Sequence, residues 1–336
     1  MTSCLTRRHV LGGAAAAAWA SGAKAETNQL RISYGYSTGY LPLMVMRDQR
    51  LIEKHAANAG LGDVAVSWQI VDGGNNTNDA MLAGALDIAG LGIPGYCVLR
   101  DRTRGRKQEV IGVTALNTGA QWLNTIEPRI KTLADYTRKD RIAMPGIKTS
   151  FAAIALQMCV AKQFGIDNYA KLDPLTVGIP HPDAYAAMMS GKTEITSHFA
   201  SAPFSYMELK NPAVHRVLST GEVFGPMSIL MTMTQRQFAE ANPGLVRAFL
   251  DAQEEANGFI KANPDGAAAA YTRVSGTKTP AAEVLQILAD PENSFNVAPT
   301  ASLAYARFLA DIGTIKERPA AWTELFLPIL KDRSGS

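Results

Sequence analysis

The sequence predicts an α/β protein in which two doubly wound lobes are joined by a hinge of two chain crossings. Strand and helix patterns alternate along most of the chain, which is typical of parallel sheets covered by helices on both faces. The pattern restarts near residue 130, where a second unit is expected to begin. A chain of 336 residues is also long for one hydrophobic core and suits two.

The first lobe is predicted from residues 28–117. Apolar runs of strand length occur at residues 30–34, 64–71, 86–89 and 110–115. An amphipathic helical pattern covers residues 41–55, and a second helix is expected to end at Leu82. Asn76 or Thr77 is the expected N-cap of that second helix.

The second lobe is predicted from residues 118–222. A short helix is expected at residues 131–136, and a strand at 141–144 precedes a long apolar helix at 150–164. A proline-containing turn at residues 178–183 then leads into another helix. The chain is expected to return to the first lobe through a strand at 228–233, so residues 223–336 add C-terminal helices to that lobe.

Two segments about a hundred residues apart share one pattern. Residues 79–88 and 185–195 each contain a helix that ends at a glycine, followed by an acidic residue and an isoleucine that open a strand. Glycine at a helix C-terminus permits a left-handed cap, so local structure explains part of the likeness. The repetition still favours two lobes of similar topology over one large sheet.

Residues 1–25 have the three parts of a secretory signal peptide. Arg7 and Arg8 are followed by an apolar run over residues 10–20 and by a small-residue cleavage site that ends at Ala25. The run is shorter than the roughly 20 residues of a membrane span. The arginine pair resembles a twin-arginine signal, and the general secretion route stays open. We expect cleavage near Ala25 and a periplasmic protein.

The charge balance argues against binding to nucleic acid or to an anionic membrane. The chain has 33 basic and 30 acidic side chains, and three of the basic ones, Arg7, Arg8 and Lys24, lie in the expected signal peptide. The remaining chain therefore has equal numbers of both signs and no basic field. Cys97 and Cys159 lack the close spacing of a metal site or disulfide framework, so we expect two buried free thiols.

The order of motifs resembles that of the solute-binding proteins of ABC importers for sulfonates, taurine and nitrate, a group that includes thiamine-precursor binders. The resemblance covers nearly the whole chain after the signal peptide. It rests on Gly35, Gly39 and Leu43 around the first strand, on residues 84–89, and on residues 241–259. It implies a periplasmic binding protein fold and a monomer that delivers a small polar, anionic solute to a membrane permease, without a cofactor.

The expected ligand-binding residues follow strands, because open parallel sheets bind ligands beyond the carboxyl ends of their strands, and the resemblance implies the same loops. The first lobe contributes Ser37, Thr38, Gly39, Tyr40, Asn75, Asn76, Gly92 and Ile93. The second lobe contributes Lys148, Thr149, Ser150, Phe151, His181, Ser197, His198 and Phe199. Asn76 stands where relatives often have a glutamine that bonds the ligand. These loops contain no arginine, and residues 199–203 replace a Trp-Asp-Pro that is common in relatives.

Several of these residues also have an ordinary structural interpretation. Thr149 and Ser150 open a helix, where they can hold an anion or simply cap the helix. Asn75 and Asn76 can bind ligand or form a turn. Tyr40 and Phe199 are candidates for the aromatic wall of a ligand site. Neither expected site histidine has a partner at metal-ligand spacing, so no metal site is predicted.

An enzyme is not expected. On the same fold, the resemblance points to one enzyme branch that makes the thiamine pyrimidine with a cysteine-rich motif and iron. This chain has no cysteine cluster and begins with an apparent export signal. A thiamine-pyrimidine-related enzyme, or a binder of a neutral heterocycle, is the alternative to the capture of an anionic solute.

Overall fold

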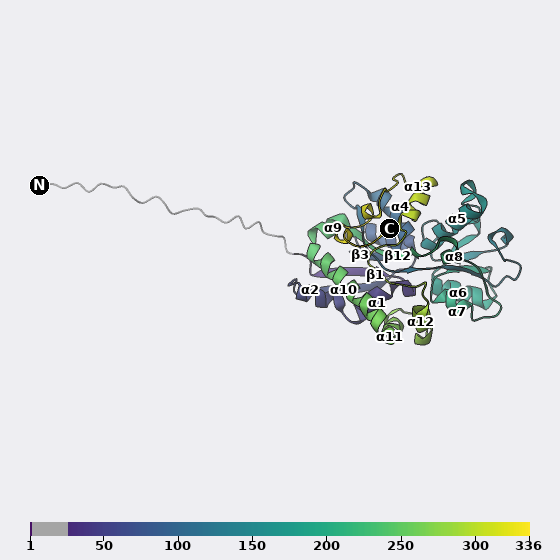
Figure 1. Cartoon of the computed structure of the whole chain (residues 1–336), viewed down its shortest axis with the longest axis horizontal. Coiled ribbons are helices and arrows are strands. Elements are labelled where there is room, and N and C mark those ends of the chain that lie inside the picture. The colour runs from purple at the N-terminus through teal and green to yellow at the C-terminus, as the bar shows by residue number, and fades with distance from the viewer. Residues whose placement is uncertain (2–25) are drawn as a thin grey trace.

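The computed structural model describes residues 26–336 together with Met1. The predicted signal peptide, apart from Met1, lies outside the described residues. The described part contains two five-stranded mixed sheets and one two-stranded ribbon, with helices around them (Figure 1). The α/β periplasmic binding protein architecture expected from the sequence is therefore confirmed.

The first sheet has the strand order β2-β1-β3-β12-β4. Its strands are β1 (Gln29–Tyr34), β2 (Ala65–Ile70), β3 (Ile88–Gly92), β4 (Val110–Ala115) and β12 (Leu230–Gln235). Strand β1 pairs in parallel with β2 and β3, whereas β12 runs antiparallel to both β3 and β4. The expectation of a parallel sheet is therefore correct for β1, β2 and β3 and wrong for β12, because the returning strand enters between two strands of the opposite direction.

The second sheet repeats this order as β8-β7-β9-β6-β10. Its strands are β6 (Trp122–Thr125), β7 (Ile142–Met144), β8 (Thr176–Gly178), β9 (Ser197–Ala200) and β10 (His215–Ser219). Strand β7 pairs in parallel with β8 and β9, and β6 runs antiparallel to β9 and β10. Each sheet thus has three parallel strands followed by an antiparallel strand and an edge strand.

Helices cover both faces of the first sheet. Helices α1, α2, α10 and α11 lie below it in Figure 1, and α4, α9 and α13 lie above it. Their bounds are α1 (Leu41–Asp48), α2 (Leu51–Asn58), α3 (Gly74–Leu82), α4 (Ile93–Thr103), α9 (Arg236–Ala241), α10 (Pro243–Ala262), α11 (Pro264–Val274) and α13 (Leu303–Asp311). Proline opens both α10 and α11, because its missing N–H costs nothing in the first helical turn.

Helices of the second unit lie on the right of Figure 1. They are α5 (Phe151–Phe164), α6 (His181–Ser190), α7 (Phe204–Glu208) and α8 (Thr220–Phe224), and α12 (Ala281–Ala289) contacts both α7 and α11. A small core of Ala143, Ala184, Met188, Ile195 and Val214 lies in this unit.

The predicted helix at 41–55 is two helices, α1 and α2. Arg50 adopts a left-handed conformation with φ of 52°, which ends the first helix and turns the chain into the second. The short helix expected at 131–136 is a single 3₁₀ turn at Leu133–Asp135, held by a capping box between Thr132 and Asp135. A left-handed residue sets the first boundary and a capping box sets the second, and the apolar pattern reveals neither.

The chain passes between the two sheets twice, and the passages pair with each other. The first passage contains β5 (Thr118–Gly119) and the second contains β11 (Met227–Ser228), and these two strands form an antiparallel ribbon. The C-terminal segment joins this region, since the backbone of Ser294 exchanges hydrogen bonds of 2.8 and 2.9 Å with Thr118. The two chain passages predicted from the sequence are therefore present, and their role as a hinge stays a prediction.

Candidate functional site

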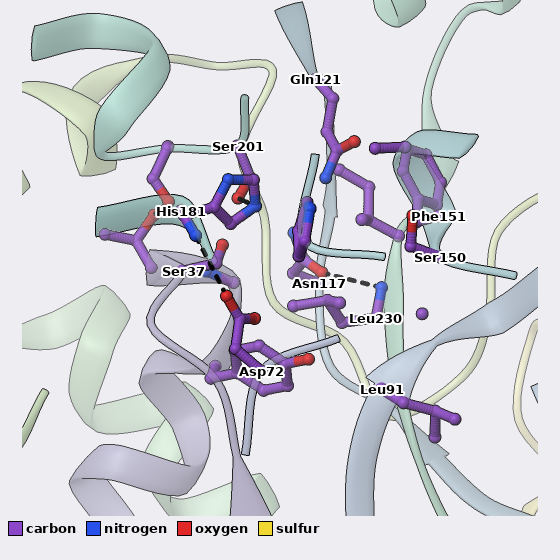
Figure 2. Close-up of a pocket in the computed structure, with 18 of the residues that line it drawn as sticks. Ser37, Asp72, Leu91, Asn117, Gln121, Ser150, Phe151, His181, Ser201 and Leu230 are labelled. Atoms are coloured by element: carbon purple, nitrogen blue, oxygen red, sulfur yellow. Dashed lines mark hydrogen bonds between the residues drawn. The ribbon is translucent and has the colours of Figure 1, made fainter. Parts of the chain in front are cut away.

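A small cavity lies where the carboxyl ends of strands from both sheets meet (Figure 2). Its walls include the ends of β1, β2 and β3 in the first sheet and of β7, β8 and β9 in the second, with the segments that follow them. The cavity volume is about 60 Å³. That space suits a small solute rather than a polymer, since one water needs a cavity of about 10–15 Å³.

Eight of the sixteen residues expected to bind ligand line this cavity: Ser37, Thr38, Gly39, Tyr40, Gly92, Ser150, Phe151 and His181. They come from both sheets. The strand-end rule therefore brings half of the expected residues together around one cavity.

The other eight lie elsewhere. Ser197, His198 and Phe199 are wholly buried in β9, behind the cavity wall. Ile93 is buried at the start of α4, and Lys148 belongs to the turn before α5. Thr149, Asn75 and Asn76 lie beside the cavity, and both asparagines are exposed.

Helix α3 begins at Gly74, two residues before the predicted caps. Asn75 and Asn76 are consequently in its first turn rather than in a preceding loop. The Asn76 side chain donates to the backbone oxygen of Asp72 at 3.1 Å, and it is Asn75 that meets the hydroxyl of Thr149, at 2.6 Å. The prediction that Asn76 or Thr77 caps this helix is therefore wrong.

Ser150 caps α5, as its ordinary interpretation predicts. Its hydroxyl accepts a hydrogen bond from the backbone nitrogen of Ala153 at 3.1 Å and donates to the backbone oxygen of Gly146. Ser150 also lines the cavity, so capping does not remove it from the site.

Glycines allow the two sheets to approach one another at the cavity. A Cβ atom on Gly92 would lie 2.9 Å from Cβ of Phe151, which belongs to α5 of the other unit. A Cβ on Gly73 would lie 2.6 Å from the backbone oxygen of Pro145, and Gly73 also has a φ of +89°. These separations are too short for a side chain, so both contacts between the units require glycine.

The ring of Tyr40 packs closely against the backbone of two further glycines. A Cβ on Gly35 would lie 2.8 Å from the Tyr40 ring, and a Cβ on Gly90 would lie 2.9 Å from it. The ring is 7% exposed, and burial, with the charge of Asp72, raises the pKa of its hydroxyl. Tyr40 is therefore a rigid, neutral part of the wall.

Sequence reasoning missed several polar lining residues, notably Asp72, Asn117, Gln121 and Ser201. Asp72 lies two residues after the end of β2. The strand-end rule therefore applies to it, and the strand pattern before it could have identified it as a site residue. Asn117 and Gln121 lie in the passage between the sheets, where no periodic pattern marks a site.

Gln121 is notable because its side-chain oxygen has no hydrogen-bond partner within residues 26–336, although the residue is only 4% exposed. Buried polar atoms are normally paired. Figure 2 shows the Gln121 side chain directed towards the cavity. This oxygen is therefore available to a hydrogen-bond donor inside the cavity.

The charge of the cavity wall is negative. Asp72 is its acidic residue, and no lysine or arginine of the described chain lines it. Burial raises the pKa of Asp72, while hydrogen bonds from the backbone nitrogens of His181 and Gly73 and the charge of His198 oppose this shift. The Asp72 carboxylate accepts from the His181 nitrogen at 3.3 Å, at the first turn of α6.

A buried chain of four side chains reaches the cavity from behind. Glu208 Oε1 lies 2.6 Å from Nδ1 of His198, and Nε2 of His198 lies 2.8 Å from Nδ1 of His181. Nε2 of His181 lies 2.9 Å from the hydroxyl of Ser201 (Figure 2). Glu208 and His198 have no exposed surface, whereas His181 and Ser201 line the cavity.

Residues 35–39 have the Gly-x-Ser-x-Gly spacing of a hydrolase nucleophile elbow. The sequence-based expectation of a non-enzyme, which assumed that no such motif occurs, is wrong on this point. The hydroxyl of Ser37 accepts from the backbone nitrogen of Gly39 at 3.0 Å and has no histidine partner in the described chain. The local turn explains the spacing, because Ser37 caps the 3₁₀ helix Thr38–Tyr40.

Two broader properties of residues 26–336 bear on the site. None of their helices has the length and apolar character to cross a membrane. Nor do they bring three or more histidine, cysteine, aspartate or glutamate side chains together in a way that holds a metal ion.

The chain was compared with known proteins. A sequence model of the NMT1-like family matches residues 23–275. No match was found among curated protein sequences. Many solved structures are similar in fold, at low sequence identity.

Three of these structures are close to the chain in length. The alkanesulfonate-binding protein SsuA from Xanthomonas axonopodis pv. citri, bound to MOPS, has a TM-score of 0.68 at 20% identity and covers 88% of this chain and 96% of its own. The periplasmic aliphatic sulphonate binding protein SsuA from Escherichia coli has a TM-score of 0.64 at 17% identity, with coverages of 87% and 90%. The periplasmic nitrate-binding protein NrtA from Synechocystis PCC 6803 has a TM-score of 0.66 at 16% identity, with coverages of 89% and 84%.

Proposed function

Because the chain belongs to the NMT1-like family, we propose that it is the solute-binding component of an ABC importer and captures one small polar solute between two lobes. Residues 28–117 with 223–336 form the first lobe, and residues 118–222 form the second. Residues 1–25 are a signal peptide that is removed near Ala25, which places the protein in the periplasm. The protein acts as a monomer, and its macromolecular partner is a membrane permease.

One observation carries this proposal: the cavity is built from strand ends of both sheets, next to the two chain passages that join them. A solute held there contacts both lobes at once, so its binding favours their closed arrangement. Thr38 of the first unit already donates to the backbone oxygen of Ala202 in the second at 2.9 Å, which is a direct contact of the closed arrangement.

The proposed ligand is a small organic solute with an anionic group, such as a sulfonate, a carboxylate or nitrate. The three solved structures named above support this class, because they are binding proteins for alkanesulfonates and nitrate. In this proposal the protein binds its solute without changing it chemically and is not an enzyme. A nitrogen heterocycle that donates to Asp72 is the competing ligand class, favoured by the absence of lysine and arginine from the described wall.

Native mass spectrometry of the protein purified from its own host tests this function, because a retained ligand adds a discrete mass. Thermal unfolding with propane-1-sulfonate, nitrate, a short carboxylate and an aminopyrimidine then separates the ligand classes. We expect one of the anions to raise the melting temperature and the mature mass to begin at Glu26. A lack of any response across the panel, with no retained ligand, would contradict the proposal.

A further inference from the structure

The chain Glu208–His198–His181–Ser201 has two possible directions of hydrogen bonding, and the direction decides what Ser201 offers to the cavity. If His181 accepts from Ser201, the serine oxygen is left as an acceptor. If His181 donates to Ser201, the serine hydrogen is free to point into the cavity. The distances between the four side chains, 2.6, 2.8 and 2.9 Å, suit either direction.

Burial selects between these directions. Glu208 has no exposed surface, and its other oxygen accepts from the side chain of Asn124 at 2.9 Å. Within residues 26–336, its side-chain partners are His198 and Asn124, so neither a lysine nor an arginine supplies a counter-charge. A buried carboxylate without a counter-charge is strongly disfavoured, so the contacts favour one proton shared by the Glu208–His198 pair in addition to that of a neutral imidazole.

The position of that shared proton does not matter for the direction. If it lies on His198, both imidazole nitrogens carry hydrogen. If it lies on Glu208, the carboxyl group donates to Nδ1, and the imidazole hydrogen is on Nε2. In both cases Nε2 of His198 donates to Nδ1 of His181, and Nε2 of His181 must then be the protonated nitrogen of a neutral ring.

We propose that the buried Glu208–His198 pair, acting through His181, fixes Ser201 as a hydrogen-bond donor towards the cavity and so selects a ligand with an anionic oxygen at that wall. This inference rests on the proposed solute-binding function and names Ser201 as a specificity-determining residue. His181 and His198 are positioning residues, because they act through Ser201. The cavity wall contains Asp72 and, within the described residues, no lysine or arginine. The hydroxyl of Ser201 therefore gives this wall a hydrogen-bond donor that points towards an anion.

The surroundings of the four side chains are consistent with a neutral His181. Burial, followed by the charge of His198, lowers the pKa of His181 well below its ordinary value. The ring of His181 stacks on Phe204, with ring centroids 5.7 Å apart. The other titratable groups that face the chain are Asp72, which accepts from the backbone of His181, and Tyr185 of α6, whose pKa is raised by burial and by the charges of Glu208 and Glu283.

The shared proton therefore sets the direction of the chain. Without it, His198 would donate from Nδ1 to Glu208, and both the bond between the two histidines and the bond to Ser201 would reverse, whichever of Glu208 and His198 had carried the proton. Ser201 would then be an acceptor towards the cavity.

Nitrogen NMR of the four histidine rings in the ligand-free mature chain, which is proposed to begin at Glu26, tests the direction without any ligand. His55→Gln and His215→Gln identify the signals of two histidines outside the network, and His181→Gln and His198→Gln identify the other two. We expect His181 as the neutral tautomer with hydrogen on Nε2 at neutral pH. Hydrogen on Nδ1 of His181 would overturn the proposal, whatever the protein binds.

A binding experiment tests the consequence for ligand selection. With propane-1-sulfonate as the probe, Ser201→Ala is expected to lower affinity by about tenfold to a hundredfold, the range for a hydrogen bond to a charged group. Ser190→Ala, an exposed position at the other end of α6, is the matched control and should bind like the wild type. Unchanged affinity of Ser201→Ala would overturn the specificity role. If the wild type does not bind the probe, the proposed ligand class fails while the NMR result still decides the direction.

Discussion

The carboxylate of Asp72, at the end of a strand in the first sheet, accepts a hydrogen bond from the backbone nitrogen of His181, in the first turn of α6 in the second unit. Helices α3 and α6 occupy equivalent places, because each leads into the third parallel strand of its sheet. The residues at their starts therefore meet across the cavity. Asn75 of α3 and Thr149 of the second unit make a second such contact.

The first prediction concerns the charge of Asp72. Burial raises its pKa, so the folded protein binds this proton more readily than the unfolded chain does. The stability that this group contributes is thus present at low pH and is lost as the pH rises from the ordinary value of 3.8 through the raised one. Asp72→Asn keeps the acceptor for His181 and should remove that loss.

Urea unfolding of the wild type and Asp72→Asn at several pH values between 4 and 7 measures this effect. The variant should gain relative stability as the pH rises, and its affinity for an anionic probe should increase about tenfold, since a like charge is removed from the wall. Asp79→Asn, an exposed position of α3, is the control. Parallel pH profiles for wild type and Asp72→Asn would contradict the prediction.

The second prediction concerns closure. Gly92→Ala introduces a methyl group that would lie 2.9 Å from Cβ of Phe151 in the other unit, so the two units cannot approach fully. We expect about tenfold or greater loss of ligand affinity and a larger radius of gyration by small-angle scattering in the presence of ligand. Gly258→Ala is the matched control, because a Cβ there meets no atom within 4 Å.

Stability distinguishes this mechanism from simple misfolding. Gly92 has an ordinary extended conformation, with φ of −69°, so alanine introduces no backbone strain. The melting temperature without ligand should therefore change little. If Gly92→Ala closes and binds as the wild type does, the close contact is not essential to the bound state.

The overall architecture was predictable because it depends on periodic features that single residues do not disturb. Gly191 follows α6 and Gly84 follows α3, and both adopt a positive φ. The two helices lead into β9 and β3, which occupy equivalent places in their sheets. The direction of β12 was not predictable, since an apolar run reads the same in both orientations. Its neighbours are set by long-range pairing with β3 and β4.

The candidate site was predictable only where strand ends define it. Ser37 and His181 follow strands β1 and β8 and line the cavity, as the strand-end rule predicts. His198 and Phe199 were expected at the surface of the site, but they belong to β9 itself and are buried. Gln121 was not predicted as a site residue, because the passage between the sheets that contains it has no helical or strand pattern of apolar residues.

The third prediction concerns Gln121. Its side-chain oxygen has no protein partner within residues 26–336 and can accept from a bound solute, so Gln121→Leu should lower affinity for a ligand that carries a donor by about tenfold. Stability without ligand should be maintained or increased, because an unsatisfied buried polar group is removed. Isothermal calorimetry and urea unfolding measure the two effects.

Gln157→Leu is the matched control for this substitution. Gln157 is 5% exposed and also has an unpaired oxygen, but its nitrogen donates to Asp173 at 2.8 Å and it does not line the cavity. Its replacement should lower stability and leave affinity unchanged. Loss of affinity in both variants would indicate a general effect on the second unit rather than a ligand contact by Gln121.

The fourth prediction concerns the cysteines. Cys97 and Cys159 are unpaired and buried, as expected from the sequence, and burial raises the pKa of each thiol to about 12. The reactive thiolate is therefore scarce at neutral pH. A maleimide should label neither residue in the native protein within minutes and both residues of the denatured chain without a reductant. Native labelling at the rate of a free thiol would show that one of these helices opens readily.

The last prediction tests whether the serines near the histidines act as nucleophiles. A serine, a histidine and an acid form the active site of many hydrolases, in which an unprotonated imidazole nitrogen takes the proton of the serine. In the direction inferred for Glu208–His198–His181–Ser201, Nε2 of His181 already carries hydrogen and donates it to Ser201. The ring therefore cannot act as a base there. We expect no covalent adduct after incubation with a fluorophosphonate, measured by intact mass beside a serine hydrolase as the positive control. An adduct on Ser201 would show that Nε2 of His181 lacks a proton, and an adduct on Ser37 would favour an enzyme over a binding protein.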